Sequence, residues 1–235
     1  MTTTSKNARI AGFFYLMLMT APLRLIYIPD TLFVHGDATA TFNNISAHEG
    51  LFRLGIASDL FTGTMTLFLT LAFYRLFRAV DRNLAVLVVL LGGVMPAAIY
   101  FFNVLNDFAV LILVRGADFL SVFDKPQRDG LAMLFLRMHD QEIHAAEVFW
   151  GLWLLPLALL IIRSGFLPRF LGWWLVVNGI AYLVMSFTGI LLPQYENTVG
   201  TYAFPAQLGE LALMLWLLIM GAKEQPLKAP LIGHA

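Results

Sequence analysis

The chain contains no cysteine and few charged residues, and both shortages narrow what it can be. The absence of cysteine excludes disulfide bonds, thiolate metal sites and cysteine nucleophiles. Charged residues make up 13% of the 235 residues, which is roughly half the share in soluble globular proteins. Lysine plus arginine equals aspartate plus glutamate, at 15 each, so no basic surface indicates nucleic-acid binding. We therefore expect neither a disulfide-stabilised domain nor a nucleic-acid partner.

Hydrophobic residues, in contrast, are more frequent than in soluble globular proteins. Hydrophobic residues make up 59% of the chain, and the mean hydropathy is +0.76. A membrane span needs about 20 mostly apolar residues, and its backbone must form its hydrogen bonds internally. Because the apolar residues follow a helical period, we predict an all-α transmembrane bundle that forms a single domain over residues 1–235. Its expected spans cover residues 9–29, 51–77, 84–106, 143–163, 168–192 and 205–222.

Several details refine these boundaries. The first apolar run lacks a convincing cleavage site, so we interpret it as an uncleaved span rather than a signal peptide. The third span could continue through Phe108–Val114, and the amphipathic stretch Leu131–Glu142 precedes the fourth. Pro96 and Pro156 should kink their helices, whereas Pro205 is expected in the first turn of the last span.

Basic residues flank the expected spans unevenly. One side carries Lys6, Arg9, Arg75, Arg78, Arg82, Arg163, Arg169, Lys223 and Lys228. The opposite loops contain Asp30, His35, Asp37 and Glu196, and only the loop at 115–129 mixes both signs. Cytoplasmic loops of membrane proteins are enriched in lysine and arginine. We therefore predict a multi-pass protein of the bacterial inner membrane with both termini in the cytoplasm.

Ionisable residues within the apolar runs indicate where a function would lie. An aspartate at the centre of a membrane helix costs roughly 2.5–3.5 kcal/mol, so such residues usually face a partner or a wet cavity. Asp59 follows His48 by eleven residues on the same helix face, and His144 and Glu147 are three residues apart. We predict a polar pocket in the periplasmic half of the bundle, formed by Arg53, Asp59, Asn103, Glu147 and Glu210.

Other polar residues have simpler interpretations. Glu49 and Arg53, four residues apart, form a natural ion pair on a helix. Arg24 is expected to extend to the outer membrane interface, and His139 to lie at the water boundary. Asn103 could hydrogen-bond between helices. The whole constellation could also be a buried network that only orders the bundle.

The mixture of histidine and carboxylate suits Zn or Fe. The expected metal ligands are His48, His144 and Glu147, and a haem held by His48 and a second histidine is the less favoured cofactor. The chain contains no HExxH zinc motif, no phosphate-binding loop and no dinucleotide fingerprint. A metal site is therefore expected from composition and depth rather than from a specific motif.

Four segments of the chain are characteristic: ARIAGFFY at 8–15, AHEGLFRLGIASDL at 47–60, RSGFLPRFLG at 163–172 and LGELALMLWLLIMG at 208–221. Together they resemble a family of prokaryotic integral membrane proteins that is known only as a domain of unknown function. The resemblance covers roughly residues 8–222 and implies one multi-span domain. It places His48, Glu49, Arg53, Asp59 and Glu210 at motif positions and implies no activity.

Three functions remain open from the sequence. In the first, the pocket binds a metal, a small molecule or a lipid headgroup, and a metal-activated water or a carboxylate base could act there. In the second, the protein is a proton-coupled carrier with Asp59 and Glu210 as titrating groups. In the third, it is an accessory subunit of a membrane complex, or a homo-oligomer, surrounded by membrane lipid.

Overall fold

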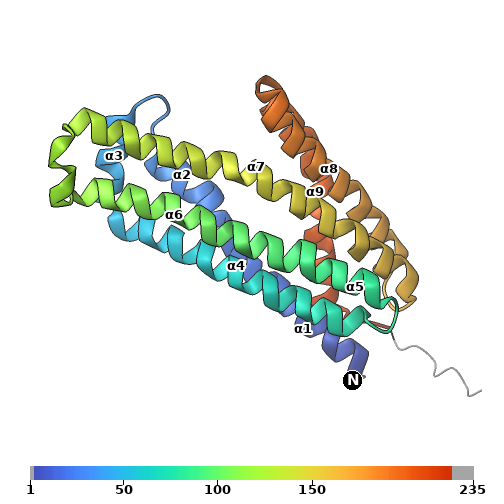
Figure 1. Cartoon of the computed structure of the whole chain (residues 1–235). Coiled ribbons are helices and arrows are strands. Elements are labelled where there is room, and N and C mark those ends of the chain that lie inside the picture. Colours follow the sequence, from blue (N-terminus) through green and yellow to red (C-terminus); the bar gives the residue numbers. More distant parts are fainter. Residues whose placement is uncertain (1–2, 224–235) are drawn as a thin grey trace, which may run out of the picture.

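The computed structural model describes residues 3–223, which form an all-helical bundle without strands (Figure 1). The α-helices are α1 (Thr3–Met17), α2 (Ile28–Leu32), α3 (Ala38–Ala47), α4 (Glu49–Phe77), α5 (Arg82–Val89), α6 (Met95–Arg115), α7 (Lys125–Ser164), α8 (Arg169–Leu191) and α9 (Glu196–Ile219). Short 3₁₀ or π segments are η1 (Leu18–Thr20), η2 (Leu23–Tyr27), η3 (Leu90–Val94), η4 (Asp118–Val122) and η5 (Pro193–Tyr195). Six helical stretches in this part of the chain are long and apolar enough to cross a membrane. The predicted all-α class and the six spans are confirmed, while Lys228 lies outside the described residues.

The first and third spans are continuous helical stretches interrupted by π-helical turns. The first span, Thr3–Leu32, contains η2, which ends just before Pro29. The third span, Arg82–Arg115, contains η3 just before Pro96. A proline cannot donate a backbone hydrogen bond, and the preceding turn rearranges to accommodate its ring. These turns rotate the following residues relative to a regular helix, and therefore change which side chains face the interior.

Two helices extend beyond the predicted spans. The helix α7 has 40 residues, about 60 Å at 1.5 Å per residue, which is twice the thickness of a hydrocarbon core. Its segment from Val148 to Ile162 contains no charged residue, whereas its first half carries most of its charges. The amphipathic stretch before the predicted fourth span is thus part of the same helix. The prediction for Pro205 was wrong, because α9 begins at Glu196 and this proline lies inside it.

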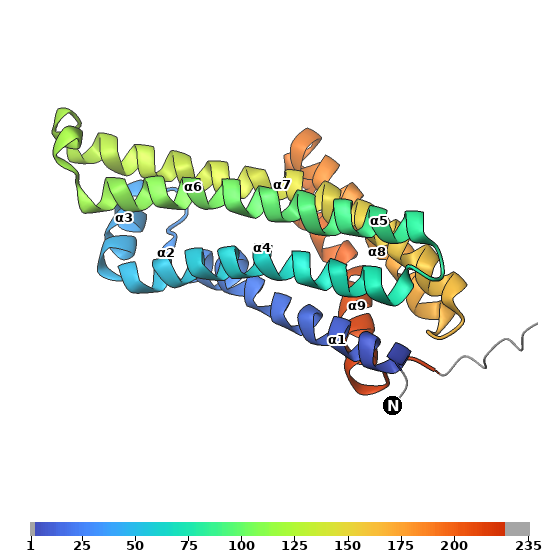
Figure 2. The same cartoon turned by 60° about the horizontal axis from the view of Figure 1, so that its bottom comes forward.

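The bundle contains two apolar cores separated along its long axis. The first core joins α1, α5, α8 and α9 with the later halves of α4 and α7. The second core joins α2 and α3 with the start of α4, the end of α6 and the start of α7, at the end far from the N-terminus (Figures 1 and 2). Between them lies what we call the inter-core layer, made of residues 57–68, 92–103 and 137–152. The polar side chains and the cavities described below lie in this layer or beside it.

Close packing of α7 on α8 depends on a pair of glycines. A Cβ atom at Gly151 would lie 2.6 Å from the carbonyl oxygen of Gly179, and a Cβ at Gly179 would lie 2.9 Å from that of Gly151. Neither contact can be relieved by moving a side chain, because the opposing atoms belong to helical backbone. Glycine at these positions therefore allows the two helix backbones to approach closely, as is typical of membrane helix pairs.

We expect Gly151→Ala to lower the thermal unfolding temperature in detergent by several degrees, because overpacking a helix contact typically costs about 1–3 kcal/mol. Gly130→Ala on the same helix is the matched control, since nothing lies within 4 Å of a Cβ added there. The control should leave the unfolding temperature unchanged or raise it, because alanine is the better helix former. Equal unfolding temperatures for the two variants, measured by circular dichroism, would contradict this account.

Candidate functional site

Polar side chains in and beside the inter-core layer form three separate groups. The first is the charge network of Arg24, Asp59, Asp107 and His139, which are all at most 1% exposed. The second surrounds Glu210, and the third joins His144, Glu147 and Glu196. The single shared pocket expected from sequence is thus divided among three places on different helix faces.

A buried ion pair connects the first span to the third. Arg24 donates from Nε to Asp107 Oδ2 at 2.9 Å and from Nη2 to Asp107 Oδ1 at 2.7 Å. Its guanidinium also lies 5.7 Å from the ring centre of Phe33 and 5.9 Å from that of Phe52. The helix α4 leaves room for this side chain at Gly55, where a Cβ would lie 3.1 Å from Arg24 Cδ. The interfacial position predicted for Arg24 was wrong, because η2 turns the residue toward the interior and Asp107 binds it there.

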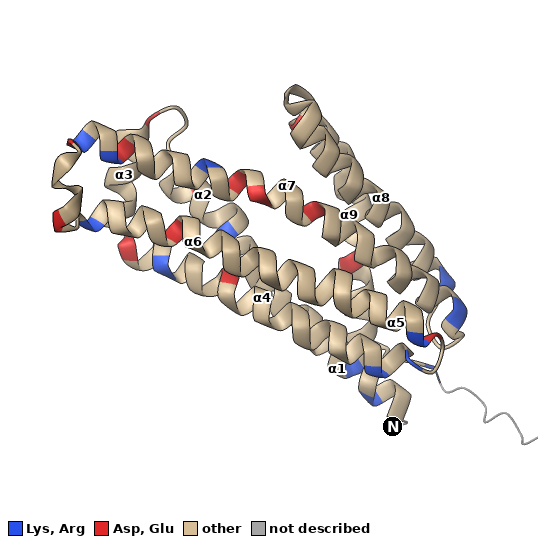
Figure 3. Ribbon diagram, in the orientation of Figure 1, with Lys and Arg blue, Asp and Glu red and all other residues tan. Residues whose placement is uncertain are grey.

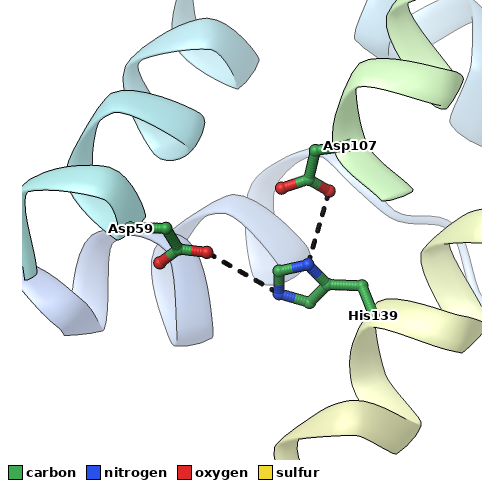
Figure 4. Close-up of side chains that lie close together, drawn as sticks. All are labelled: Asp59, Asp107 and His139. Atoms are coloured by element: carbon green, nitrogen blue, oxygen red, sulfur yellow. Dashed lines mark ion pairs between the residues drawn. The ribbon is translucent and has the colours of Figure 1, made fainter. Parts of the chain in front are cut away.

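His139 lies between two carboxylates in this network. Its Nδ1 is 3.6 Å from Asp107 Oδ1 and its Nε2 is 3.9 Å from Asp59 Oδ2 (Figure 4). Neither ring nitrogen has a hydrogen-bond partner, and neither does Asp59 Oδ1. The backbone carbonyl of His139 accepts a hydrogen bond from Asn103 at 3.2 Å. The predicted interhelical role of Asn103 is confirmed, whereas the position of His139 at the water boundary was wrong because the residue is fully buried.

The charges of the network decide what it could bind. Asp59, Asp107 and His139 bring ligand atoms within 4.8 Å of one another, a spacing that could hold a metal ion. However, Arg24 already engages both oxygens of Asp107. With a neutral imidazole, the two carboxylates and the guanidinium leave one uncompensated negative charge. One proton neutralises that charge, whereas a divalent ion would leave an excess positive charge in a desolvated place. The residues therefore fit a shared proton better than a divalent metal.

Glu210 accepts hydrogen bonds from three side chains on two other helices, α1 and α8. Tyr15 donates to Oε2 at 2.5 Å and Asn178 donates to Oε1 at 3.1 Å, while Tyr182 provides a further hydrogen bond. Aromatic side chains surround this carboxylate and line a cavity of about 260 Å³, which also borders Thr62 and Thr66. They are Tyr15, Tyr100, Trp150, Trp153 and Tyr182. The lining of this cavity contains no lysine, arginine or histidine, so the carboxylate has no cationic partner there.

A second, much smaller cavity connects the network to this region. It has a volume of about 10 Å³ and is lined by Asp59 and His139, which gives room for about one water molecule. The two cavities share the walls formed by Leu25, Tyr100 and Trp150. These three side chains therefore separate the two cavities by a single layer.

The third group lies between α7 and the beginning of α9. His144 Nδ1 is 3.5 Å from Glu147 Oε2, and His144 Nε2 is 3.7 Å from Glu196 Oε1. These side chains line an open cavity of about 570 Å³ together with Asn197 and Thr201. His144 and Glu147, which the sequence predicts as metal ligands, are thus brought together, and Glu196 joins them.

Two predicted residues lie away from the layer. His48 is exposed at the junction of α3 and α4, and its side chain makes no capping hydrogen bond. Arg53 pairs with Glu49 at 2.6 Å, which confirms the predicted ion pair, and Arg115 binds the same carboxylate at 2.8 Å. Both residues therefore lie near the end of the second core rather than beside Asp59.

Sequence reasoning did not select the Arg24–Asp107 pair. The available signal was that both residues end an apolar run on the same predicted side of the membrane and carry opposite charges. Two such residues at equal depth are expected to pair, because each alone is costly.

We expect Arg24→Met to lower the free energy of unfolding by about 3–5 kcal/mol, since it leaves Asp107 charged, buried and unpaired. The double variant Arg24→Met/Asp107→Leu should recover most of the loss. Arg53→Met, the same substitution at an exposed ion pair, should change stability little. Chemical denaturation in mixed micelles measures all three, and a single Arg24→Met variant as stable as the wild type would refute the role assigned to the pair.

Comparisons with known proteins identify a family without an assigned activity. An uncharacterised protein of Archaeoglobus fulgidus is 30% identical over 79 residues, which cover 32% of this chain and 44% of that protein. The alignment thus spans less than half of that relative. No solved structure matches the chain. The family model described as "Domain of unknown function (DUF4386)" matches residues 10–221. Because that match covers nearly the whole chain, the protein belongs to this family of integral membrane proteins, as its apolar spans and its four characteristic segments indicated.

Proposed function

We propose that the protein binds an amphipathic organic cation in the cavity beside Glu210. The observation that carries this proposal is a carboxylate enclosed by aromatic rings, without a cationic side chain in the cavity lining. A carboxylate inside a membrane is costly unless a cation or a proton compensates its charge. An organic cation would compensate the negative charge of Glu210, and its apolar groups would lie against the aromatic rings.

The walls of the cavity suit such a ligand. The rings of Trp150 and Tyr182 lie edge to face at 5.8 Å, and Trp150 stacks on Tyr100 at 6.5 Å. Faces of tryptophan and tyrosine attract ammonium groups by about 0.5–2 kcal/mol each, and aromatic cages bind quaternary ammonium ions in this way. A cavity of about 260 Å³ has room for a small ligand rather than for a whole lipid.

The rim of the cavity supports access from the bilayer. Met19 on η1 and Leu211 on α9 both line the cavity and are 49% and 40% exposed. Residues this exposed on apolar helices face lipid in a membrane-spanning bundle. An amphipathic cation concentrates at membrane surfaces, so an opening between the first span and α9 would admit it without passage through the aqueous phase.

The charge distribution supports a particular orientation. Basic residues gather at the end of the bundle that holds the N-terminus (Figure 3). Among residues 3–223, the acidic residue at that end is Asp81 alone. Following the positive-inside rule, we place this end in the cytoplasm of a bacterial cell, as one domain in the inner membrane. The second core then lies toward the periplasm, and the inter-core layer lies in the periplasmic half.

Binding can be tested with benzyltrimethylammonium and its uncharged carbon isostere, neopentylbenzene. We expect the cation to change the fluorescence of Trp150 and Trp153 saturably in the wild type, because both indoles line the cavity. Glu210→Gln should weaken the affinity for the cation at least tenfold, which is a loss of about 1.4 kcal/mol. The affinity for the neutral isostere should be unchanged, because it cannot use the carboxylate.

Glu142→Gln is the matched control, since Glu142 is a carboxylate outside the cavity lining that contacts Asn106. It should bind the cation as the wild type does. The proposal fails if the wild type gives no saturable signal with the cation, or if Glu210→Gln binds it with unchanged affinity.

The charge network favours a second function, that of a proton-coupled carrier. Asp59 and His139 need one proton for neutrality, and they share walls with the larger cavity. The charged groups that face them are Arg24 and Asp107, and Asp140 lies within electrostatic range of Arg24. Arrival of a cation beside Trp150 would then favour release of that proton.

In liposomes that contain the protein and an internal pH-sensitive dye, we expect benzyltrimethylammonium to cause proton movement. Asp59→Asn should abolish the proton signal and retain the fluorescence response to the cation. Retention of both signals in Asp59→Asn would exclude this residue as the coupling group. Equal proton movement in protein-free liposomes would show that the movement is non-specific and would contradict this function.

A further inference from the structure

The geometry around His144 carries an inference that is independent of the Glu210 cavity. The imidazole of His144 is held in place by α8. A Cβ at Gly189 would lie 2.6 Å from His144 Nδ1, so the ring packs directly on that glycine. The hydroxyl of Ser186 donates to the carbonyl oxygen of His144 at 2.6 Å. The side chain of His144 is 10% exposed. A histidine fixed in this way presents its two nitrogens in defined directions.

Each nitrogen of this ring faces a carboxylate. Nδ1 lies 3.5 Å from Glu147 Oε2, which is on the same helix, and Nε2 lies 3.7 Å from Glu196 Oε1 at the start of α9. Glu147 is also nine-tenths buried, and its Oε2 and His144 Nδ1 are without hydrogen-bond partners. The ring and both carboxylates line the same open cavity. Buried polar atoms of a native structure are usually paired, and a cation on Nε2 would place the ring proton on Nδ1, where it faces the unpartnered Glu147 Oε2.

The charge of the group specifies the class of ligand. Two carboxylates contribute two negative charges, and the residues lining this cavity include no lysine or arginine. A divalent cation would balance both charges. This distinguishes the group from the charge network, where Arg24 already neutralises one of the two aspartates.

We propose that His144 Nε2 and Glu196 bind a divalent transition-metal ion, and that Glu147 accepts a hydrogen bond from His144 Nδ1. Histidines that bind metal commonly donate their other ring N–H to a carboxylate, which fixes the tautomer. Zn–N and Zn–O bonds of about 2.1 Å in a tetrahedral site place two ligand atoms about 3.4 Å apart. The observed separation of 3.7 Å between Nε2 and Glu196 Oε1 is close to that value. Imidazole with carboxylate favours Zn²⁺, Fe²⁺ or Mn²⁺ over Mg²⁺.

The remaining coordination positions face the open part of the cavity. Asn197 and Thr201 line it beside Glu196, one turn apart on α9. Water or a side-chain oxygen of Asn197 would complete the coordination. The metal would join α7 to the beginning of α9, two elements that are far apart in the sequence. His48, which the sequence placed among the metal ligands, has no part in this site, and Glu196 takes its place.

Co²⁺ is the probe of choice, because its visible absorption reports nitrogen and oxygen ligation directly. The full chain, purified in detergent with an affinity tag free of histidine and stripped with a chelator, should bind one Co²⁺ per chain, displaced by Zn²⁺. Glu196→Gln should weaken Co²⁺ affinity at least tenfold, and it is half exposed, so the fold should be retained. Glu147→Gln should weaken the affinity by about 10–100-fold while keeping the absorption bands, since it acts through the imidazole.

His48→Ala is the matched control, because it removes an exposed histidine at the junction of α3 and α4, which does not line the cavity of the proposed site. It should bind Co²⁺ as the wild type does. The inference is overturned if the wild type binds no Co²⁺ saturably, or if Glu196→Gln and Glu147→Gln bind it as tightly as the wild type. Loss of binding in His48→Ala with retention in Glu196→Gln would also overturn it, in favour of a different ligand set.

Discussion

The buried pair of Arg24 and Asp107 sets the arrangement of the layer between the two cores. Both side chains are fully buried, and charges in such surroundings are tolerated only with good geometry and a partner. The pair therefore fixes how far the first span is rotated and how deeply it lies against α6. That position directs one oxygen of Asp107 toward His139 and leaves Asp59 as the carboxylate without a cation of its own. A different rotation of the first span would remove the network and also the rim of the larger cavity, which η1 and η2 form.

The sequence determines the number of spans well, because the physical constraint is local. A backbone in hydrocarbon must satisfy its own hydrogen bonds, so each apolar run of sufficient length becomes a helix. The same reasoning fails at helix ends. Hydropathy detects where an apolar run ends, but a helix can continue beyond that run, as α7 does over Lys125–Ser164. The start of α9 at Glu196, well before Pro205, has the same cause.

Contacts between residues of one helix were predictable for the site, and the rotation of each helix about its axis was not. His144 and Glu147 face each other because a spacing of three residues is a property of any helix. The contacts between Arg24 and Asp107, and between His144 and Glu196, join different helices. They depend on the rotation of each helix about its own axis. The π-helical segments η2 and η3 change this rotation, and their effect has no periodic signature in the sequence. Residues at one depth were therefore assigned to one site, although bulky Trp150 and Tyr100 separate Asp59 from Glu210.

The three polar groups differ in the charge that their own residues leave uncompensated. Asp59, Asp107 and Arg24 leave one negative charge in a cavity with room for little more than a proton and a water. Glu210 also leaves one, but in a larger aromatic cavity, for which we propose an organic cation. His144, Glu147 and Glu196 leave two, at an open place with a fixed imidazole. The first two groups carry the same charge in cavities of different size, and the third carries a larger charge; our proposals of a proton, an organic cation and a divalent metal ion rest on these differences. Leu25, Tyr100 and Trp150 line both of the first two cavities, so the places that we propose for the proton and the organic cation share a wall.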